Sequence, residues 1–201
     1  MKLTLSAVAL ILGSTMAHAA SNDIDGDGVP NDAEALLHSD PMVADTDGDG
    51  MNDLADDNAV FAADPTTASK TAAPFRIGEL LVENNVDPVA HKDADDHLEI
   101  QVINDSAAPL SGFTLYYTLT DNESGATEAY IAHPDLTVPA NGDARIHVDA
   151  SDSAGHLRAN PNSIYVTSQA GKHVSVSLQL DGSAAVTATI EKDAGGAEQA
   201  D

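Results

Sequence analysis

The residues best suited to chemistry in this sequence are two groups of aspartates with the spacing of calcium ligands. A calcium loop of 12 residues takes oxygens from positions 1, 3, 5, 9 and 12 and from the backbone carbonyl of position 7, and glycine at position 6 allows a sharp turn. Both requirements are met in DIDGDGVPNDAE, which begins at Asp23, and in DTDGDGMNDLAD, which begins 22 residues later. The candidate metal ligands are Asp23, Asp25, Asp27, Val29, Asn31 and Glu34 in the first loop and Asp45, Asp47, Asp49, Met51, Asp53 and Asp56 in the second.

The ligand types indicate calcium as the bound ion, Ca2+. All of them are hard oxygen donors, which suit calcium, whereas zinc and copper prefer nitrogen or sulfur and magnesium needs a small octahedral site. Position 12 is Glu34 in the first loop but the shorter Asp56 in the second. We therefore expect the second site to bind more weakly or to take an oxygen from its neighbour.

The excess of negative charge in this part of the chain predicts that calcium is needed for it to fold. Residues 21–64 contain 13 acidic residues and no Lys or Arg. Without metal, these carboxylates repel one another, so the free energy of ion binding becomes free energy of folding.

The same stretch resembles the bacterial thrombospondin type 3 repeat. The resemblance rests on the two DxDGDG motifs, on Ser39-Asp40-Pro41 after the first and on Ala63-Asp64-Pro65 after the second, and it covers roughly residues 22–66. It implies a calcium-stabilised, loop-rich solenoid with a structural role in secreted or envelope proteins. Asp56 departs from the usual Glu, and residues 58–63 lack the usual glycine, which predicts an irregular second half.

Two other classes of calcium protein share some of these features. A paired helix-loop-helix sensor needs an apolar residue at loop position 8 to bridge its two loops. This chain has Pro30 and Asn52 at that position, which disfavours a sensor. A dockerin-like module also has two loop-helix repeats about this far apart, so a protein-docking role remains an alternative, although Pro30 and the Asp-Pro breaks favour the thrombospondin type.

The first 19 residues have the pattern of a secretory signal peptide. Lys2 precedes a short apolar run, and Ala17-His18-Ala19 is a small-x-small cleavage site. We therefore expect an exported protein, periplasmic or extracellular, without membrane insertion after the signal is removed. The formal net charge of −25 disfavours nucleic acid and anionic membranes as partners, and the absence of Cys excludes disulfides.

Beyond the repeats, the sequence predicts a mainly β domain. We divide the chain into a signal peptide (1–19), calcium-binding repeats (20–66), a linker (67–74), a β-sandwich (75–191) and a disordered tail (192–201). Short segments rich in Val, Ile, Thr and Tyr alternate apolar and polar residues, which favours an antiparallel, immunoglobulin-like sandwich. The expected strands are Phe75–Val82, Leu98–Asn104, Gly112–Thr120, Thr127–Ala132, Ala144–Asp149, Ser163–Ser168, His173–Leu180 and Ala185–Ile190. Because adjacent strand residues face opposite ways, one of Tyr116 and Tyr117 is expected in the core.

The sandwich sequence contains no catalytic motif, so the chain is predicted not to be an enzyme. We expect a calcium-binding structural or interaction protein whose sandwich presents a surface to an envelope or extracellular protein or glycan. The alternative is a ligand-carrying or transition-metal-handling module that binds zinc, copper or a sugar. Its candidate sites are the loop containing His91 and His97 and the loop at residues 155–162.

Overall fold

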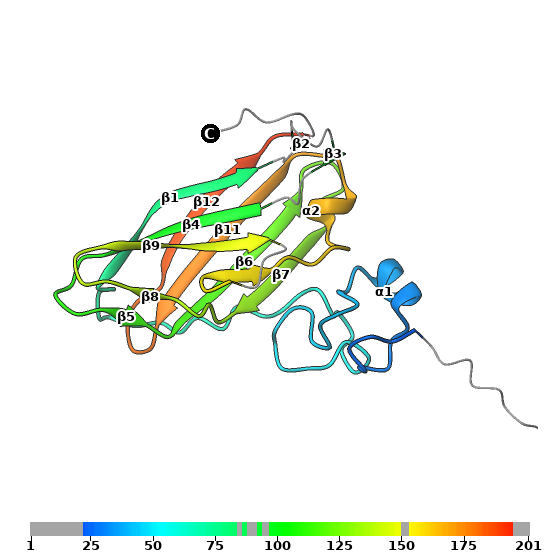
Figure 1. Ribbon diagram of the computed structural model, residues 1–201, viewed down its shortest axis with the longest axis horizontal. Helices are drawn as coiled ribbons and strands as arrows, with labels where there is room; N and C mark the ends of the chain where they lie inside the picture. The colour runs from blue at the N-terminus through cyan, green and yellow to red at the C-terminus, as the bar shows by residue number, and fades with distance from the viewer. Residues whose placement is uncertain (1–21, 84–85, 88–91, 94–96, 150–152, 195–201) are drawn as a thin grey trace, which may run out of the picture.

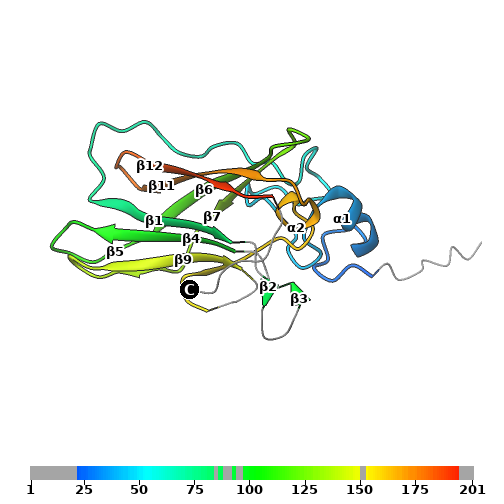
Figure 2. The same cartoon turned by 90° about the horizontal axis from the view of Figure 1, so that it is seen from above.

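The computed structural model describes residues 22–83, 86–87, 92–93, 97–149 and 153–194. Within these ranges the chain is mainly β and forms two four-stranded sheets that lie face to face (Figures 1 and 2). The acidic repeat segment lies beside one end of this sandwich, near the helix α2 and the strand β7.

The first sheet has the order β1-β4-β9-β10, and the second has the order β12-β11-β6-β7. The strands of the first sheet are β1 (Phe75–Glu83), β4 (His97–Asn104), β9 (Asp143–Asp149) and β10 (His156–Arg158). Those of the second are β12 (Val186–Lys192), β11 (Lys172–Leu180), β6 (Phe113–Asp121) and β7 (Thr127–Ala132). Two short pairs complete the described strands: β2 (Val86–Asp87) with β3 (Lys92–Asp93), and β5 (Leu110–Ser111) with β8 (Thr137–Val138). These pairings are antiparallel, except that β10 runs parallel to β9.

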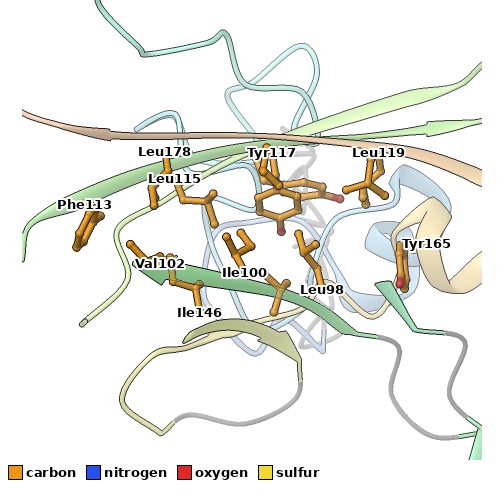
Figure 3. Packing of buried hydrophobic residues seen from close by; sticks show 14 of the residues in the cluster. Leu98, Ile100, Val102, Phe113, Leu115, Tyr117, Leu119, Ile146, Tyr165 and Leu178 are labelled. Atoms are coloured by element: carbon orange, nitrogen blue, oxygen red, sulfur yellow. The ribbon is translucent and has the colours of Figure 1, made fainter. Parts of the chain in front are cut away.

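Alternation along the strands builds the core between the two sheets. In β6, every second residue from Phe113 to Asp121 is buried, and the residues between them are half-buried on the outer face. Phe113, Leu115 and Tyr117 therefore point toward Ile100 and Val102 of β4 (Figure 3). The core packs at aromatic contacts as well, since Phe75 meets Phe113 edge-on with ring centroids 5.2 Å apart.

The expected strands are confirmed with one exception. Residues Ser163–Ser168 do not form a strand, because Ile164–Thr167 form the short helix α2. The Ser163 hydroxyl accepts a hydrogen bond from the Tyr165 N–H and caps the helix. This local cap overrides the strand preference of Ile, Tyr and Val in that segment. Strand β10 was not predicted, and neither were the four short strands.

Two of the predicted segments contact the second sheet. In the predicted linker, residues 67–74, Thr67 exchanges hydrogen bonds with the Gln179 side chain and Thr71 accepts one from the Ala184 N–H. The predicted tail begins too early, because Lys192 is the buried last residue of β12. The segment before residue 75 is thus hydrogen-bonded to the second sheet along its length from Thr67 to Thr71.

Candidate metal centre

The two aspartate loops have the same local geometry. Asp23 accepts hydrogen bonds from the N–H groups of Gly26 (2.8 Å) and Gly28 (3.2 Å). Asp45 accepts the equivalent bonds from Gly48 and Gly50, both at 2.9 Å. The glycines at position 6 have positive φ, 103° in the first loop and 95° in the second, as the predicted sharp turn requires.

Position 9 closes each loop in the same way. In the first loop, the Asn31 side chain accepts a hydrogen bond from the Ile24 N–H at 3.1 Å. In the second, the Asp53 side chain accepts one from the Thr46 N–H at 2.8 Å. The 22-residue repeat in sequence is therefore also a repeat in structure, which an unstructured acidic linker would not show.

Helix α1 (Asn31–Leu37) begins at position 9 of the first loop and contains its last predicted ligand. Glu34 lies in the first turn and is fully buried. The helix ends where His38 adopts a left-handed conformation with φ of 65°. At position 12 of the second loop, the Asp56 N–H bonds to the Asn52 carbonyl, as the Glu34 N–H bonds to the Pro30 carbonyl in the first loop. The second loop forms turns here instead of a helix.

Three groups of carboxylates bring their oxygens within 4.8 Å of one another in the described part of the chain: Asp23, Asp25 and Asp27; Asp45, Asp47 and Asp49; and Asp27, Glu34 and Asp53. The first two groups are positions 1, 3 and 5 of each loop, as predicted. The third group, which we call the inter-loop cluster, was not predicted. It joins positions 5 and 12 of the first loop to position 9 of the second. The sequence predicted that the second site would bind more weakly or take an oxygen from its neighbour; in this cluster the second loop contributes Asp53 to the first.

Several carboxylate oxygens in these groups are buried without a hydrogen-bond donor among the described residues. They are Asp25 Oδ2, Asp27 Oδ2, Glu34 Oε1, Glu34 Oε2 and Asp47 Oδ2. Glu34 is 0 % exposed and Asp47 is 1 % exposed. Burial, with the neighbouring carboxylates of Asp25 and Asp27, raises the pKa of Glu34 to about 7.

The same physical causes act on the other buried acids. Burial raises the pKa of Asp47 to about 6, with a further contribution from the Asp49 carboxylate. Burial likewise raises the pKa of Asp25 and of Asp53. These shifts mean that the charged form of each acid lacks a compensating positive group in its surroundings. A bound cation is the group that would supply it, and the all-oxygen donor set fits a hard cation such as calcium.

Four predicted ligands stand apart from these groups: Val29, Asn31, Met51 and Asp56. Asp56 belongs to none of the three carboxylate groups, and its side chain accepts a hydrogen bond from the Asn58 N–H at 2.8 Å. Val29 and Met51 occupy position 7, where the backbone carbonyl is the expected ligand. Their N–H groups bond to Asp27 and Asp49, respectively, at 2.6 and 2.8 Å.

The repeat segment also contacts the sandwich directly, which the sequence did not reveal. The Arg158 guanidinium pairs with both carboxylate oxygens of Asp40, at 2.7 and 3.2 Å. The side-chain amides of Asn160 and Asn162 donate to the carbonyls of His38 and Ser39, at 2.6 and 2.7 Å. Arg158, Asn160 and Asn162, in the predicted candidate loop at residues 155–162, therefore contact the chain's own repeats.

The edge of strand β7 is covered in the same way. The Ile131 N–H donates to the Asp47 carbonyl at 2.7 Å, and Ala129 exchanges hydrogen bonds with Val60 and Ala62, both at 2.9 Å. Of the two adjacent tyrosines, Tyr117 is in the core, as predicted for one of them. Tyr116 is on the outer face, and its hydroxyl lies 3.5 Å from the Ala62 carbonyl.

The histidine site remains a prediction. His91 lies outside the described residues, as do Asp95 and Asp96, and His97 is placed only as the first residue of β4. In the ranges that the structure describes, no helix is both long and apolar enough to cross a membrane.

Comparisons with known proteins add no family. No family model and no curated protein matches this chain. Among solved structures, it is similar to the Pseudomonas fluorescens alkylpurine DNA glycosylase AlkC bound to DNA containing an abasic site analog. The similarity covers 61 % of this chain and 31 % of the glycosylase chain, with 17 % sequence identity and a TM-score of 0.32. A likeness at this level carries no argument about function.

Proposed function

We propose that this chain is an exported, non-enzymatic protein in which calcium orders the N-terminal repeats and the folded repeats and sandwich together present a binding surface. The observation that carries the proposal is the set of buried carboxylate oxygens without hydrogen-bond donors in the two loops. Burying an unpaired carboxylate is costly unless a counter-charge accompanies it. A divalent cation in each group would provide that charge.

Calcium is favoured over other cations by the donor set and by the shape of the loops. The groups contain carboxylates without histidine or cysteine. The loops place positions 1, 3 and 5 together, and position 6 has the left-handed backbone that calcium loops need. We expect affinities in the range of roughly 10⁻⁴ to 10⁻³ M that is typical of extracellular calcium modules.

We further infer that the sandwich is of the immunoglobulin-like type. The order β12-β11-β6-β7 matches the G-F-C-C′ order of such domains, and β1-β4-β9 matches A-B-E. This superfold does not specify a function by itself. It does supply a rigid body against which the repeats are held.

The surface for a partner includes the repeats. Large apolar side chains that are exposed in the described residues concentrate there rather than on the sandwich, where Val166 is the example. Exposed apolar side chains mark an interaction surface where they form one contiguous patch. The exposed residues in the repeats are Ile24, Leu36, Leu37, Met42, Met51, Leu54 and Phe61. The partner we propose is a protein or glycan of the cell envelope or of the extracellular medium.

Calcium titration calorimetry on the full chain tests the proposal. The variant Glu34→Gln keeps the shape of the buried side chain but removes its charge. Its matched control is Asp32→Asn, which makes the same change of charge on the exposed face of the same helix. We expect saturable calcium binding in the wild type, weaker binding in Glu34→Gln by about tenfold or more, and unchanged binding in Asp32→Asn.

Two outcomes would contradict the proposal. No binding heat and no shift in melting temperature up to about 10 mM calcium, above the usual range for such modules, would mean that the loops are not calcium sites. Equal weakening in Glu34→Gln and Asp32→Asn would mean that the acidic segment attracts calcium only through its overall charge. Titration with zinc in saturating calcium addresses the metal-handling alternative, which requires a site that survives calcium loading.

A further inference from the structure

The ion pair between Arg158 and Asp40 connects the sandwich to the repeats at a buried position. The Asp40 side chain is 3 % exposed, whereas the Arg158 side chain is 40 % exposed. Arg158 lies at the end of β10, so its position is fixed by pairing with β9. Asp40 is separated from it by 118 residues in sequence.

From Asp40, a chain of hydrogen bonds leads to the inter-loop cluster. The Asp40 N–H donates to the Thr46 hydroxyl at 2.8 Å, and that hydroxyl donates to Asp53 Oδ2 at 2.7 Å. The Thr46 N–H donates to Asp53 Oδ1 at 2.8 Å. Thr46 thus holds both oxygens of Asp53, whose carboxylate completes the cluster with Asp27 and Glu34.

A second connection runs directly from the second loop to strand β7. Asp47, a member of the second carboxylate group, accepts the Ile131 N–H at its backbone carbonyl. Gly48 packs so closely that a Cβ atom at this position would lie 2.2 Å from the Ile131 carbonyl oxygen. Of the two carboxylate groups that involve the second loop, one therefore contacts the sandwich directly and the other is connected to it through Thr46 and Asp40.

Hydrogen bonds and one ion pair join the two parts around an open space. A cavity of about 180 Å³ lies between them, lined by Asp40, Asp45 and Gly48 on one side and by Tyr130, Ile131 and Arg158 on the other. Close-packed cores do not contain spaces of this size. Separation of the two parts therefore breaks the hydrogen bonds and the ion pair described above.

We propose that cation binding in the repeats and docking of the repeats on the sandwich are one coupled equilibrium, with Arg158 and Thr46 as positioning residues for Asp53. This inference rests on the proposed calcium function and adds its regulation. Docking places Asp53 in the inter-loop cluster. A cation in that cluster holds Asp53 in the position in which it bonds to Thr46, which in turn bonds to Asp40, the partner of Arg158. Coupling between two sites is reciprocal, so a residue of the sandwich sets the calcium affinity of loops that it does not touch.

Calcium affinity of two arginine variants tests the coupling. Arg158→Gln removes the pair with Asp40. Arg145→Gln is the matched control, because Arg145 is 35 % exposed and pairs with Glu79 and Glu99 within the first sheet. By calorimetry on the full chain, we expect Arg158→Gln to weaken at least one calcium-binding step by roughly 5-fold to 150-fold, the usual range for coupled sites. Arg145→Gln should leave the affinity unchanged.

A pair of variants at Thr46 separates positioning from general loss of structure. Thr46→Val keeps the shape and removes the hydroxyl, whereas Thr46→Ser keeps the hydroxyl. We expect Thr46→Val to weaken calcium binding and Thr46→Ser to retain wild-type affinity. In the wild type, hydrogen exchange at the Ile131 and Ala129 amides should slow when calcium is added, because calcium favours the docked state.

The results distinguish this inference from the proposed function. If the wild type binds calcium while Arg158→Gln and Thr46→Val bind it equally well and Ile131 exchange does not respond, the coupling is wrong and the calcium function stands. If the wild type does not bind calcium, both are wrong.

Discussion

Buried carboxylates occur in both parts of the molecule, but their surroundings differ. In the sandwich, Asp121 accepts hydrogen bonds from the N–H groups of Glu123 and Ser124 and from the Ser168 hydroxyl, and it pairs with Lys172 at 3.1 Å. In the repeats, both oxygens of Glu34 are buried without such a donor among the described residues. One site is electrostatically complete within the protein, and the other is not.

The pKa shifts follow this difference. The Ser124 N–H, together with the Ser168 hydroxyl and the Lys172 ammonium, holds the pKa of Asp121 well below its usual range. Burial acts in the opposite direction on Glu34, whose pKa is raised to about 7. We infer from this comparison that a buried carboxylate without donors is a candidate cation site, whereas one with its donors present is a structural anchor.

Removal of calcium should have the largest effect and should act on the repeats and on the edge strand β7 that they cover, but not on the core strands. In chelator, we expect residues 23–56 to lose protection in hydrogen exchange, because the unpaired carboxylates repel one another. Strands β4, β6 and β11 should keep their protection, because their core contains no ion site among the described residues. At a calcium concentration of 100 times Kd, the ion contributes about 2.7 kcal/mol to the stability of the state that binds it.

Readdition of calcium serves as the control, because protection of the repeats should then return. An equal concentration of magnesium should restore that protection only in part. Loss of protection throughout both sheets in chelator would show that the sandwich also depends on calcium, and the contrast between the two parts would fail.

A cavity in the sandwich core should destabilise the sandwich and leave calcium binding by the repeats unchanged. Ile100 is 0 % exposed between the two sheets. Ile100→Ala should destabilise the sandwich by about 2–5 kcal/mol. Urea unfolding followed by the signal of the β-sheet should show this loss with calcium and without it. Calcium affinity should not change under conditions where the variant is folded, and a change of more than a few-fold would mean that core packing and the loops are linked.

Much of this arrangement could be predicted from local patterns in the sequence. Alternation of apolar residues located the main strands, because one face of each must be buried. The spacing of aspartates and glycines located the loops, because each loop closes on its own backbone. The Asp23 and Asp45 side chains accept their hydrogen bonds from residues three and five positions later.

Long-range contacts could not be predicted in this way. The inter-loop cluster depends on how Asp53 of one loop lies beside Glu34 of the other, and no spacing rule encodes it. The pair between Arg158 and Asp40 joins residues that are distant in sequence and gives no local signal. Helix α2 was missed for a different reason, since the Ser163 cap outweighed the strand preference of the residues after it.

Two equivalent glycines allow the contact with the sandwich to be measured separately from the loop geometry. Gly26 and Gly48 both occupy loop position 4, with φ of 78° and 77°. An added Cβ at Gly26 meets no atom within 4 Å, whereas at Gly48 it lies 2.2 Å from the Ile131 carbonyl oxygen. Alanine at either position should cost about 1–2 kcal/mol for the left-handed backbone.

Gly48→Ala should lower the free energy of unfolding more than Gly26→Ala does, because it also disrupts the contact with β7. Thermal melts in saturating calcium would compare the two, and hydrogen exchange at Ile131 should increase only in Gly48→Ala. Equal costs with equal Ile131 exchange would mean that the repeats are not held against β7 in solution.

The smallest effect we predict is the contribution of Asp121 to the pH dependence of stability. Because its pKa is lower in the folded chain than in the unfolded chain, the stabilisation from Asp121 is present above the ordinary pKa of Asp, about 3.9. It is lost as the pH falls below that value toward the depressed folded pKa. The measurement is the free energy of unfolding of the wild type minus that of Asp121→Asn, in metal-free protein from pH 7 to pH 3.

Taking this difference cancels the titration of the acidic loops, which is common to both proteins. The difference should be constant from pH 7 to about pH 5 and should shrink toward pH 3, because the unfolded Asp121 then binds a proton that the folded carboxylate excludes. A difference that grew as the pH fell would mean that the Asp121 pKa is raised by burial, as in the loops. The distinction between a completed carboxylate in the sandwich and incomplete carboxylates in the repeats would then no longer hold.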